Sequence, residues 1–547
     1  MRAPLLALLL LWLRPAVATV QLVAPADGAV ERGSAVTLMA HDDDGDAGDV
    51  TAMLNGVDVS ARLRGTGGDR TVVLAGVPGG TNPLRRGKNH VDLHAGGTVA
   101  SGTFTWRPKM QRVHLVVVGN KLDFAAYESF ATWQAEVDRI FDTLVRRHLK
   151  RGRPNVVLLT EDFGLPAGLL GSRGATTRAA KDQDPLTALS NLFVAYATQS
   201  QYYQTHFMLP GTGIQPFARA LILALTDTLW RAVVPTLAAK AQALGVYLVG
   251  CTNVAPAHVS TDACDVGMFG DVDDPGRTEV FLPDGSDVYN TAFVWGPDGA
   301  LLGTTRKVNL TPPEIDILNL SNGALGDVPV FDTPAGRIGI AISLDAFIPE
   351  YVHRLDDLGA TLVLQPDANP GLWATPPGEI WQPDEWTESV LGMLRADLPN
   401  LTYNATSMMA GNFFPGALDQ TGHPAGILFD GQSTVTKRTT RPPRRSFVAM
   451  APGSSLTILG QPLLGEFVAV SPWIFPDPGK LRTAKQLAAL AARCATTAPA
   501  ASPRALSLEQ RRQLLYDCAA TLLPGGANAD GYRESVVTAD VTLPVAP

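Results

Sequence analysis

The chain has 547 residues, of which 46% are hydrophobic and 18% charged. This length and composition argue against disorder and predict two or more folded units, at least one with a sizeable core. The net charge of -8 leaves no dominant basic surface, so binding to a nucleic-acid backbone is not expected.

Residues 1–18 have the pattern of a secretory signal. Arg2 supplies a positive start, Leu5 to Leu13 form an apolar run, and Ala16 and Ala18 give a small-residue exit. A buried helix or a membrane anchor is the alternative, but the run is far shorter than the roughly 20 residues that span a bilayer. We expect a secreted or periplasmic protein whose mature chain has no membrane span.

Residues 19–108 are predicted to form a small immunoglobulin-like β-sandwich. Short β-rich runs such as VQLVA, AVTLMA and RTVVLAG alternate with clusters of Gly, Pro, Asn and Asp at close spacing. Such a unit could recognise a partner, or it could be a spacer that packs on the main domain. The sequence leaves both roles open.

Residues 109–475 change to apolar strands separated by helical stretches. The runs VHLVVVG, NVVLLTEDFG and GVYLVGC read as buried strands, with helices expected over Phe130 to Leu149 and Leu221 to Leu244. This alternation predicts an α/β domain with well-buried sheets, whose strand-end loops would carry any chemistry.

Residues 476–530 read as a helical insertion, followed at 531–547 by a final strand that returns to the main sheet. Ser507 and Gln510 have capping-box spacing at the start of one helix. Cys494 and Cys518 would lie on two short helices and are the expected disulfide pair. The two other cysteines, Cys251 and Cys264, match no zinc template, so we expect a buried structural cysteine or a second disulfide.

Three segments that end or follow apolar strands carry residues suited to acyl transfer. They are LLTEDFG with Glu161, TTRKVNLTPPE with Lys307 and GRIGIAISLDAFIPE with Ser343. A carboxylate base, a cation that stabilises an oxyanion and a hydroxyl nucleophile are what this chemistry requires. Taken singly, each is more often a solvated charge or a turn former.

In this order and with these flanks, the segments resemble the carbon-nitrogen hydrolase (nitrilase/amidase) superfamily, whose members carry Glu, Lys and Cys in that order. DVYNTAFVWGPDGALLGTTRKVNL looks like the family's stretch leading to its lysine. VFDTPAGRIGIAISLDAFIPEYVHRLDDLGATLVLQPDAN looks like its nucleophile strand, the next helix and the next strand. The resemblance implies a four-layer α-β-β-α sandwich, no metal and no organic cofactor.

The resemblance also implies roles for individual residues. Glu161 would be the general base, Lys307 the oxyanion stabiliser and Glu314 the carboxylate that orients Lys307. The backbone NH of Leu344 would complete the oxyanion hole, and Asp345 matches an acid that many relatives carry two places after the nucleophile. Asn290 would lie on the approach to the lysine strand in a structural role.

Ser343 stands where the family carries its cysteine. A Glu with pKa ~4.3 that deprotonates a thiol of pKa ~8.5 works against about 6 kcal/mol before the site helps. For a hydroxyl as weakly acidic as water, the gap in pKa is wider and the cost grows by up to about 10 kcal/mol, although concerted transfer lowers it. His353 could be imagined in a Ser-His-Asp triad, but a surface or packing role suits its helical position better.

Three functions follow from these observations. The first is an exported hydrolase that acts on non-peptide, amide-type C-N bonds through a Glu161, Lys307 and Ser343 site, with a small amide, nitrile or ester as substrate. The second is a catalytically silent relative that binds a small carboxylate or amide ligand, or a protein partner. The third is an esterase or acyl transferase on the same scaffold. Homo-oligomers are frequent in the family, so this chain could form one too.

Overall fold

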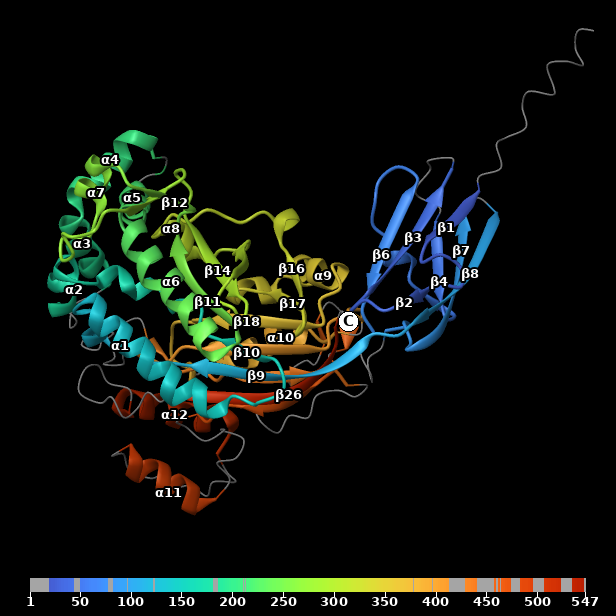
Figure 1. Cartoon of the computed structure of the whole chain (residues 1–547). Coiled ribbons are helices and arrows are strands. Elements are labelled where there is room, and N and C mark those ends of the chain that lie inside the picture. The colour runs from blue at the N-terminus through green and yellow to red at the C-terminus, as the bar shows by residue number, and fades with distance from the viewer. Residues whose placement is uncertain are drawn as a thin grey trace, which may run out of the picture.

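In the computed structural model, the described residues are 19–43, 50–76, 82–95, 97–121, 123–180, 185–209, 211, 213–376, 378–395, 397–412, 428–439, 457–458, 461–462, 464–473, 483–494, 506–522 and 534–545. The proposed signal at residues 1–18 lies outside them. The N-terminal strands form a lobe of their own beside the main body (Figure 1).

The N-terminal lobe consists of two small sheets around one hydrophobic core. One sheet has the order β1 (Val20–Ala24), β3 (Val36–Asp42), β6 (Asp69–Leu74). The other has the order β2 (Val30–Glu31), β8 (Thr98–Trp106), β7 (Gly87–Ala95), β4 (Thr51–Leu54), β5 (Val57–Asp58). Inward residues of both sheets alternate with outward ones, as along β3, because side chains on a strand point to opposite faces. The immunoglobulin-like type of this lobe stays a prediction.

Polar contacts fasten this lobe to the main body near one helix, α9 (Pro349–Asp357). Arg62 forms an ion pair with the buried Asp356 on that helix, and Arg64 Nε lies 2.9 Å from Asp357 Oδ2. The side-chain oxygen of the buried Asn400 accepts the Ala75 amide at 2.8 Å. The lobe is therefore held against the segment that follows Ser343 in the chain.

The main body contains two six-stranded sheets, so the predicted mixed α/β architecture is confirmed. The first has the order β15 (Leu301–Arg306), β14 (Tyr289–Trp295), β11 (Tyr247–Val254), β10 (Asn155–Leu158), β9 (Lys109–Gly119), β26 (Ser535–Val545). The second has the order β16 (Val330–Thr333), β17 (Gly336–Ile340), β18 (Leu362–Asp367), β19 (Tyr403–Met408), β22 (Thr434–Lys437), β25 (Glu466–Val470). Three consecutive strands of each sheet run parallel, namely β9, β10 and β11 in the first and β17, β18 and β19 in the second. The strands that flank each set run antiparallel to it.

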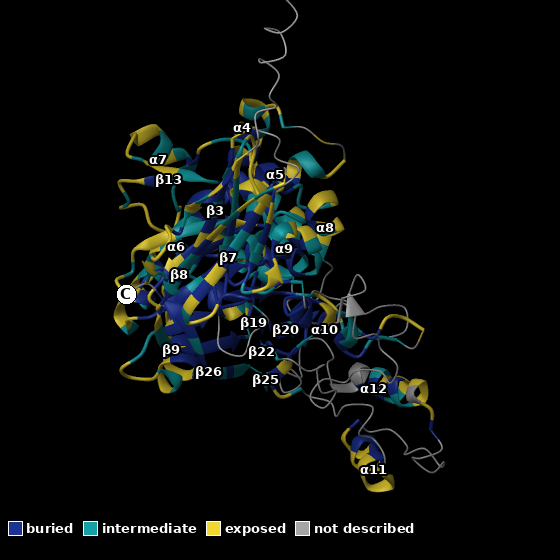
Figure 2. Cartoon of the chain, turned by 90° about the vertical axis from the view of Figure 1, so that its right-hand side faces the viewer, coloured by how far each residue is buried: buried dark blue, intermediate teal, exposed yellow. Residues whose placement is uncertain are grey.

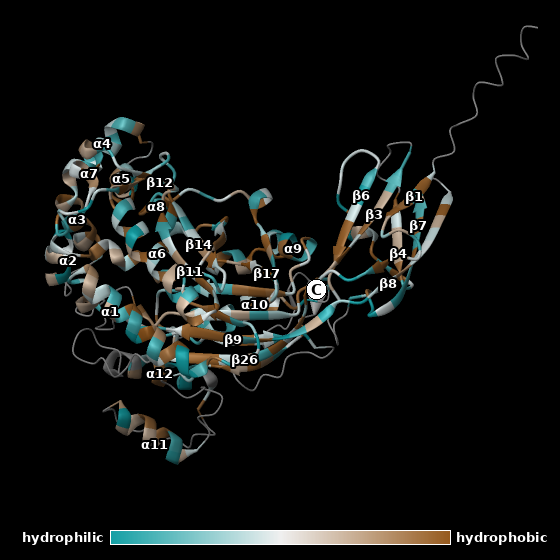
Figure 3. Cartoon of the chain, viewed as in Figure 1, coloured by the Kyte–Doolittle hydropathy of each residue, from teal (hydrophilic) through white to brown (hydrophobic). Residues whose placement is uncertain are grey.

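Apolar side chains join the two sheets face to face and also cover their outer faces. Val117 and Leu158 of the first sheet share one cluster with Ile340 and Leu364 of the second. Alternate residues of the same strands point outward into a second apolar cluster, so both faces of each strand are buried and the strands read as almost uninterrupted apolar runs. Figure 3 shows β9 and β26 largely in the brown of hydrophobic residues. Helices pack on both outer faces, and Figure 2 shows dark buried strands between more exposed helices.

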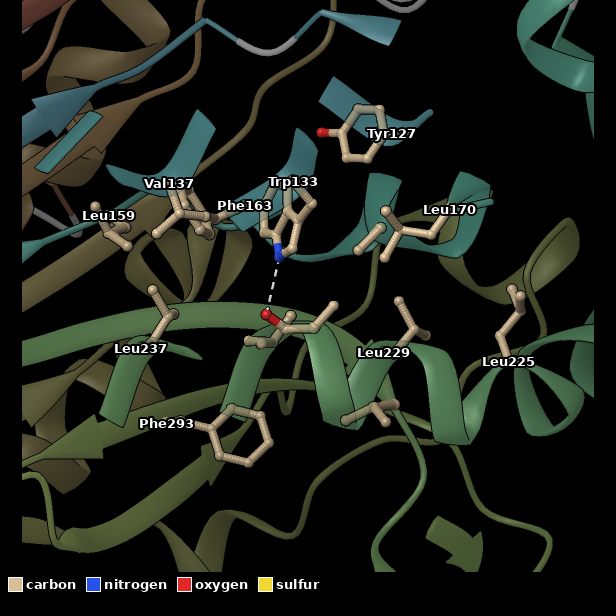
Figure 4. Close-up of a cluster of buried hydrophobic side chains, with 14 of the residues drawn as sticks. Tyr127, Trp133, Val137, Leu159, Phe163, Leu170, Leu225, Leu229, Leu237 and Phe293 are labelled. Carbon is tan, nitrogen blue, oxygen red and sulfur yellow. Dashed lines mark hydrogen bonds between the residues drawn. The ribbon is translucent and has the colours of Figure 1, made fainter. Parts of the chain in front are cut away.

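The helices of the first outer face fix the loop that carries Glu161. Trp133 of α1 (Phe130–Ile140) donates its indole NH to the Ala232 carbonyl on α6 (Thr226–Leu244) at 2.9 Å (Figure 4). Leu159 and Phe163 pack in the same cluster, on either side of Glu161 in sequence. The loop therefore has little freedom to move.

Two helix predictions in this layer were wrong in extent. The stretch expected as one helix over Phe130 to Leu149 ends as α1 at Ile140 and continues as a π turn and a 3₁₀ turn to His148. The helix expected from Leu221 to Leu244 is two helices, α5 (Gln215–Ala224) and α6, which meet at Leu225. Among the described residues no single helix has the length and hydropathy to cross a membrane. Helices α5 and α6 reach that length and hydropathy only when taken together, and they meet at a bend of 51°.

The remaining helices lie around the sheets. They are α2 (Ala175–Ala179), α3 (Pro185–Ala195), α4 (Ala197–Phe207), α7 (Ala263–Phe269), α8 (Pro312–Asp316), α10 (Gln382–Gly392), α11 (Ala484–Arg493) and α12 (Leu508–Leu522). The predicted Cys494 to Cys518 disulfide is confirmed and joins α11 to α12, whereas Cys251 and Cys264 are both free thiols. Strand β26 pairs antiparallel with β9 along its length, so this strand lies at the edge of the first sheet.

Candidate active site

The ends of two strands of the first sheet, with the short helix α8, bring the expected charged residues together. Glu161 follows β10, Lys307 follows β15, and Glu314 lies on α8 just beyond Lys307. Lys307 Nζ lies 2.7 Å from Glu161 Oε1 and 2.8 Å from Glu314 Oε2. Glu161 is 4% exposed and Lys307 1% exposed. A buried ammonium between two carboxylates is thus the centre of the site.

Neutral groups complete this cluster. Asn290 Nδ2 donates to Glu161 Oε1 at 2.8 Å and to Glu314 Oε1 at 3.0 Å. Glu314 Oε2 also accepts the Thr311 amide at 2.8 Å, as part of a capping box that opens α8. Asn290 therefore has the structural role expected of it, because it holds the two carboxylates on either side of Lys307.

The pKa values of the two glutamates are shifted in opposite directions. Burial would lower the pKa of Lys307, but Glu161 and Glu314 outweigh it and raise that pKa, so the ammonium stays charged. Burial opposes ionisation of Glu314 too, yet Lys307 and the Thr311 amide lower its pKa. Burial dominates at Glu161 and raises its pKa. Of the two glutamates, Glu161 is therefore the one that more readily holds a proton.

Ser343 is held in an uncommon backbone conformation shortly after β17. Its φ is 45°, in the left-handed region that few residues other than glycine adopt. The residue is half-buried and begins a 3₁₀ turn over Ser343–Phe347 after β17. Such strain persists only where the surroundings impose it and is frequent at functional sites.

Asp345 fastens this turn to the segment after Lys307. Its Oδ1 accepts the Asn309 amide and the Asn309 side-chain Nδ2, both at 2.8 Å. The Val308 amide also donates to Asp345 Oδ1 at 3.2 Å. Burial raises the pKa of Asp345 to about 7 against these hydrogen bonds. The acid two places after Ser343 therefore positions the turn that begins at Ser343 against the segment after Lys307. The role of the Leu344 amide stays a prediction.

Asp367 was not singled out in the sequence, although it lies against Ser343. Strands β17 and β18 are parallel with Ile340 opposite Leu364, a register that carries Ser343 toward Asp367. The Ser343 hydroxyl favours the ionised form of this 1% exposed carboxyl, yet Asp367 Oδ1 has no well-formed hydrogen bond within the described residues.

Glu161 reaches the same place from the other sheet. Its Oε2 accepts the amide of Ala368, the residue after Asp367, at 3.1 Å. Asp162, which sequence reasoning also missed, lies beside Glu161, and burial raises its pKa well above the ordinary value. An acidic residue at the carboxyl end of the strand next to the nucleophile strand is the signal that could have identified Asp367.

Neither His353 nor the buried Cys251 offers another catalytic group. His353 lies on α9, and its Nε2 is 3.2 Å from Asp397 Oδ2, with a side chain 40% exposed. It therefore has the surface role expected of it. Cys251 is buried in β11, where burial and the nearby Glu161 raise the pKa of its thiol well above the usual range. A thiol kept protonated is a poor nucleophile.

Comparison with known proteins agrees with this geometry. Residues 263–438 match the family model of the carbon-nitrogen hydrolases, and the matched segment includes Lys307, Glu314, Ser343 and Asp367. Residues 263–438 therefore carry a carbon-nitrogen hydrolase segment. Glu161 lies before the matched segment and joins it in space through its contact with Lys307.

Individual relatives match over short segments. The chain is 34% identical over 100 residues to Nitrilase 2 of Arabidopsis thaliana, which is 17% of this chain and 29% of that protein. It is 34% identical over 90 residues to an omega-amidase of Homo sapiens, 16% of this chain and 33% of that protein. The chain thus matches about a third of the length of these curated relatives.

Solved structures of the same superfamily are similar over more of the chain. A carbon-nitrogen hydrolase from Helicobacter pylori G27 is 16% identical, with 60% of this chain and 82% of that chain covered and a TM-score of 0.36. An amidase from a Nesterenkonia species is 18% identical, with 60% and 82% covered and a TM-score of 0.31.

Proposed function

We propose that this chain is a hydrolase of amide-type C-N bonds that uses Ser343 as its nucleophile. The observation that carries the proposal is the buried Lys307, held between Glu161 and Glu314 at 2.7 and 2.8 Å. Desolvating three charged groups is costly, and a buried ion pair is weak evidence for added stability. A catalytic use of the ammonium and the carboxyl accounts for their presence beside a strained serine.

Each residue has a role that its surroundings support. Attack of Ser343 Oγ on the substrate carbonyl would place negative charge on the carbonyl oxygen, which Lys307 and the Leu344 amide would stabilise. Glu161, whose pKa burial raises, would protonate the departing nitrogen and later activate the water that hydrolyses the acyl-enzyme. Glu314 would hold Lys307 in position.

The substrate class is proposed from the relatives, which are named as an omega-amidase, an amidase and a nitrilase. A small amide is the first expectation and a small nitrile the second. An ester is a further substrate, because an alcohol nucleophile opens an activated ester more easily than an amide. We also propose export, with residues 1–18 as the signal, which the disulfide between Cys494 and Cys518 supports.

One observation favours a second function. The serine lacks the acidity of the family's cysteine, which suits a catalytically silent protein that binds a small carboxylate or amide ligand at Lys307. Such a protein would be stabilised by its ligand and would release no product.

The test is a panel of small amides, nitriles and esters, with release of ammonia or acid as the readout. We expect turnover by the native chain that is abolished in Ser343→Ala and reduced at least about 100-fold in Glu161→Gln. Cys264→Ser is the matched control and should retain native turnover, because this free thiol is exposed.

The alternatives give different results in the same assay. Native turnover that survives in Ser343→Ala would contradict the role of this serine as nucleophile. Turnover that appears only in Ser343→Cys would identify an intact but silent site and would support the binding function.

A further inference from the structure

We propose that Asp367 is a catalytic residue that accepts the proton of the Ser343 hydroxyl during attack on the substrate. The inference rests on the proposed function and adds a proton acceptor to it. Ser343 and Asp367 follow from one parallel pair of strands, since Ile340 of β17 lies opposite Leu364 of β18. Ser343 lies three residues after Ile340, and Asp367 lies three residues after Leu364. The register of the two strands therefore brings the Ser343 hydroxyl to the Asp367 carboxyl.

Glu161 is less well placed to take this proton. Its Oε1 accepts Lys307 Nζ at 2.7 Å and Asn290 Nδ2 at 2.8 Å, while its Oε2 accepts the Ala368 amide at 3.1 Å. These three hydrogen bonds hold Glu161 against the ammonium of Lys307. Asp367 Oδ1, by contrast, is buried and has no well-formed hydrogen bond within the described residues.

A buried side-chain network fixes the other oxygen of Asp367. Gln365 Nε2 donates to Asp367 Oδ2 at 3.4 Å and to Ser389 Oγ at 3.0 Å. Gln365 Oε1 in turn accepts Asn404 Nδ2 and Thr406 Oγ1, each at 3.0 Å. The glutamine is thus locked with its amide nitrogen toward Asp367, which leaves Oδ1 for the Ser343 hydroxyl.

The charges around Asp367 suit proton transfer near neutral pH. Burial raises the pKa of Asp367 to about 7; Glu161 adds to this rise, while Ser343, Lys307 and Gln365 oppose it. Asp162 is a further carboxyl close enough to interact with it. A general base is most effective when its pKa lies near the working pH.

The proposed step balances as an acyl transfer. The O–H bond of Ser343 breaks and its proton moves to Asp367, while an oxygen electron pair forms the bond to the substrate carbonyl carbon. The carbonyl π electrons move to its oxygen, beside Lys307. When the intermediate collapses, the C-N bond electrons leave with nitrogen, which takes a proton from Glu161. Water then attacks the acyl carbon and gives one proton back to Glu161, the C-O bond to the serine breaks, and the serine oxygen takes its proton back from Asp367 as the acid is released.

The first experiment measures activation of Ser343 without knowledge of the substrate. A fluorophosphonate probe forms a bond from Ser343 Oγ to phosphorus with loss of fluoride and is quantified by mass spectrometry of the labelled peptide. We expect Asp367→Asn to slow labelling at least about 100-fold and to remove the rise of the native rate through pH 7. Asp430→Asn is the matched control, because burial also raises the pKa of Asp430 to about 7 and its Oδ1 accepts the Trp373 amide.

The outcomes separate this inference from the proposed function. Labelling in Asp367→Asn at the native rate and with the native pH profile would overturn the role of Asp367 alone. Failure of the native serine to react with either the probe or the substrate panel would overturn the nucleophile and, with it, the proton acceptor.

The second experiment tests the contact itself in a Ser343→Cys background. An ionised Asp367 disfavours a neighbouring thiolate, so Asp367→Asn added to Ser343→Cys should lower the pKa of the new thiol by about one unit. The alkylation rate of that cysteine by iodoacetamide at pH 7 should then rise about tenfold, read on its own peptide so that Cys251 and Cys264 do not contribute. An unchanged rate would contradict the contact.

Discussion

Replacing Lys307 by Met tests whether the buried ammonium holds the site together. Methionine keeps most of the side-chain volume and removes the charge, so the change acts on electrostatics more than on packing. The side chains of Lys307, Glu161 and Glu314 are 2%, 5% and 11% exposed, so solvent does little to compensate. Two charge-assisted hydrogen bonds are lost at about 1.5–3 kcal/mol each, and removing one partner of a buried pair costs about 3–5 kcal/mol.

We therefore expect Lys307→Met to lower the free energy of unfolding by about 4 kcal/mol at pH 8. Without the cation, the pKa of Glu161 in the folded state rises further above its unfolded value of ~4.3. Stability that depends on the protonated carboxyl is present below pH ~4.3 and is lost as the pH rises through the folded pKa. The deficit of the variant should therefore be smaller at pH 5 than at pH 8.

Urea unfolding of the native and variant chains at both pH values, followed by tryptophan fluorescence and circular dichroism, measures this difference. A triple variant with Lys307→Met, Glu161→Gln and Glu314→Gln is the matched control, since it leaves no unpaired charge and should recover much of the loss. A deficit below about 1 kcal/mol, or one that is equal at the two pH values, would refute the electrostatic account of this cluster.

Two further predictions concern regions away from the site. Arg62→Ala should lower the free energy of unfolding by about 3–5 kcal/mol, because it removes the ion-pair partner of the buried Asp356 between the N-terminal lobe and α9. Arg64→Ala removes the half-exposed pair with Asp357 and should cost less than about 1 kcal/mol, so equal losses in urea titrations would contradict this reasoning. Reduction of the disulfide between Cys494 and Cys518, 24 residues apart, should destabilise α11 and α12 by about 3 kcal/mol, seen as faster proteolysis of that segment; unchanged cleavage would show that packing alone holds it.

Patterns within single segments predicted much of the fold. The apolar runs of β9, β10 and β11 identified buried strands because both faces of their sheet are covered. The capping box at Ser507 and Gln510 forms as expected, with the Ser507 amide 2.8 Å from Gln510 Oε1. These features depend on local sequence alone, so a single chain is enough to predict them.

Helix interruptions escaped prediction because no residue marks them. Leu225 lies between α5 and α6 with backbone angles of -81° and -3°, still in the helical region, and it is an ordinary apolar residue. The apolar periodicity continues across the bend, since Leu221 and Leu229 pack in the same cluster. Tertiary packing decides where such a helix divides, and a pattern of hydrophobic residues does not record it.

The charge balance of the site links the missed residues to the serine. Within the described part of the chain, Lys307 is the cation that lowers the pKa of Glu161, Asp162 and Asp367, and burial outweighs it at all of these carboxyls. A cysteine nucleophile needs mainly a cation that favours its thiolate, because a thiol of pKa ~8.5 is already acidic. A serine stays protonated beside the same cation and needs an acceptor that takes its proton during attack. A buried carboxyl with a pKa near neutrality, placed by strand register against Ser343, supplies that acceptor; the serine and Asp367 are therefore best understood as one paired feature of this chain.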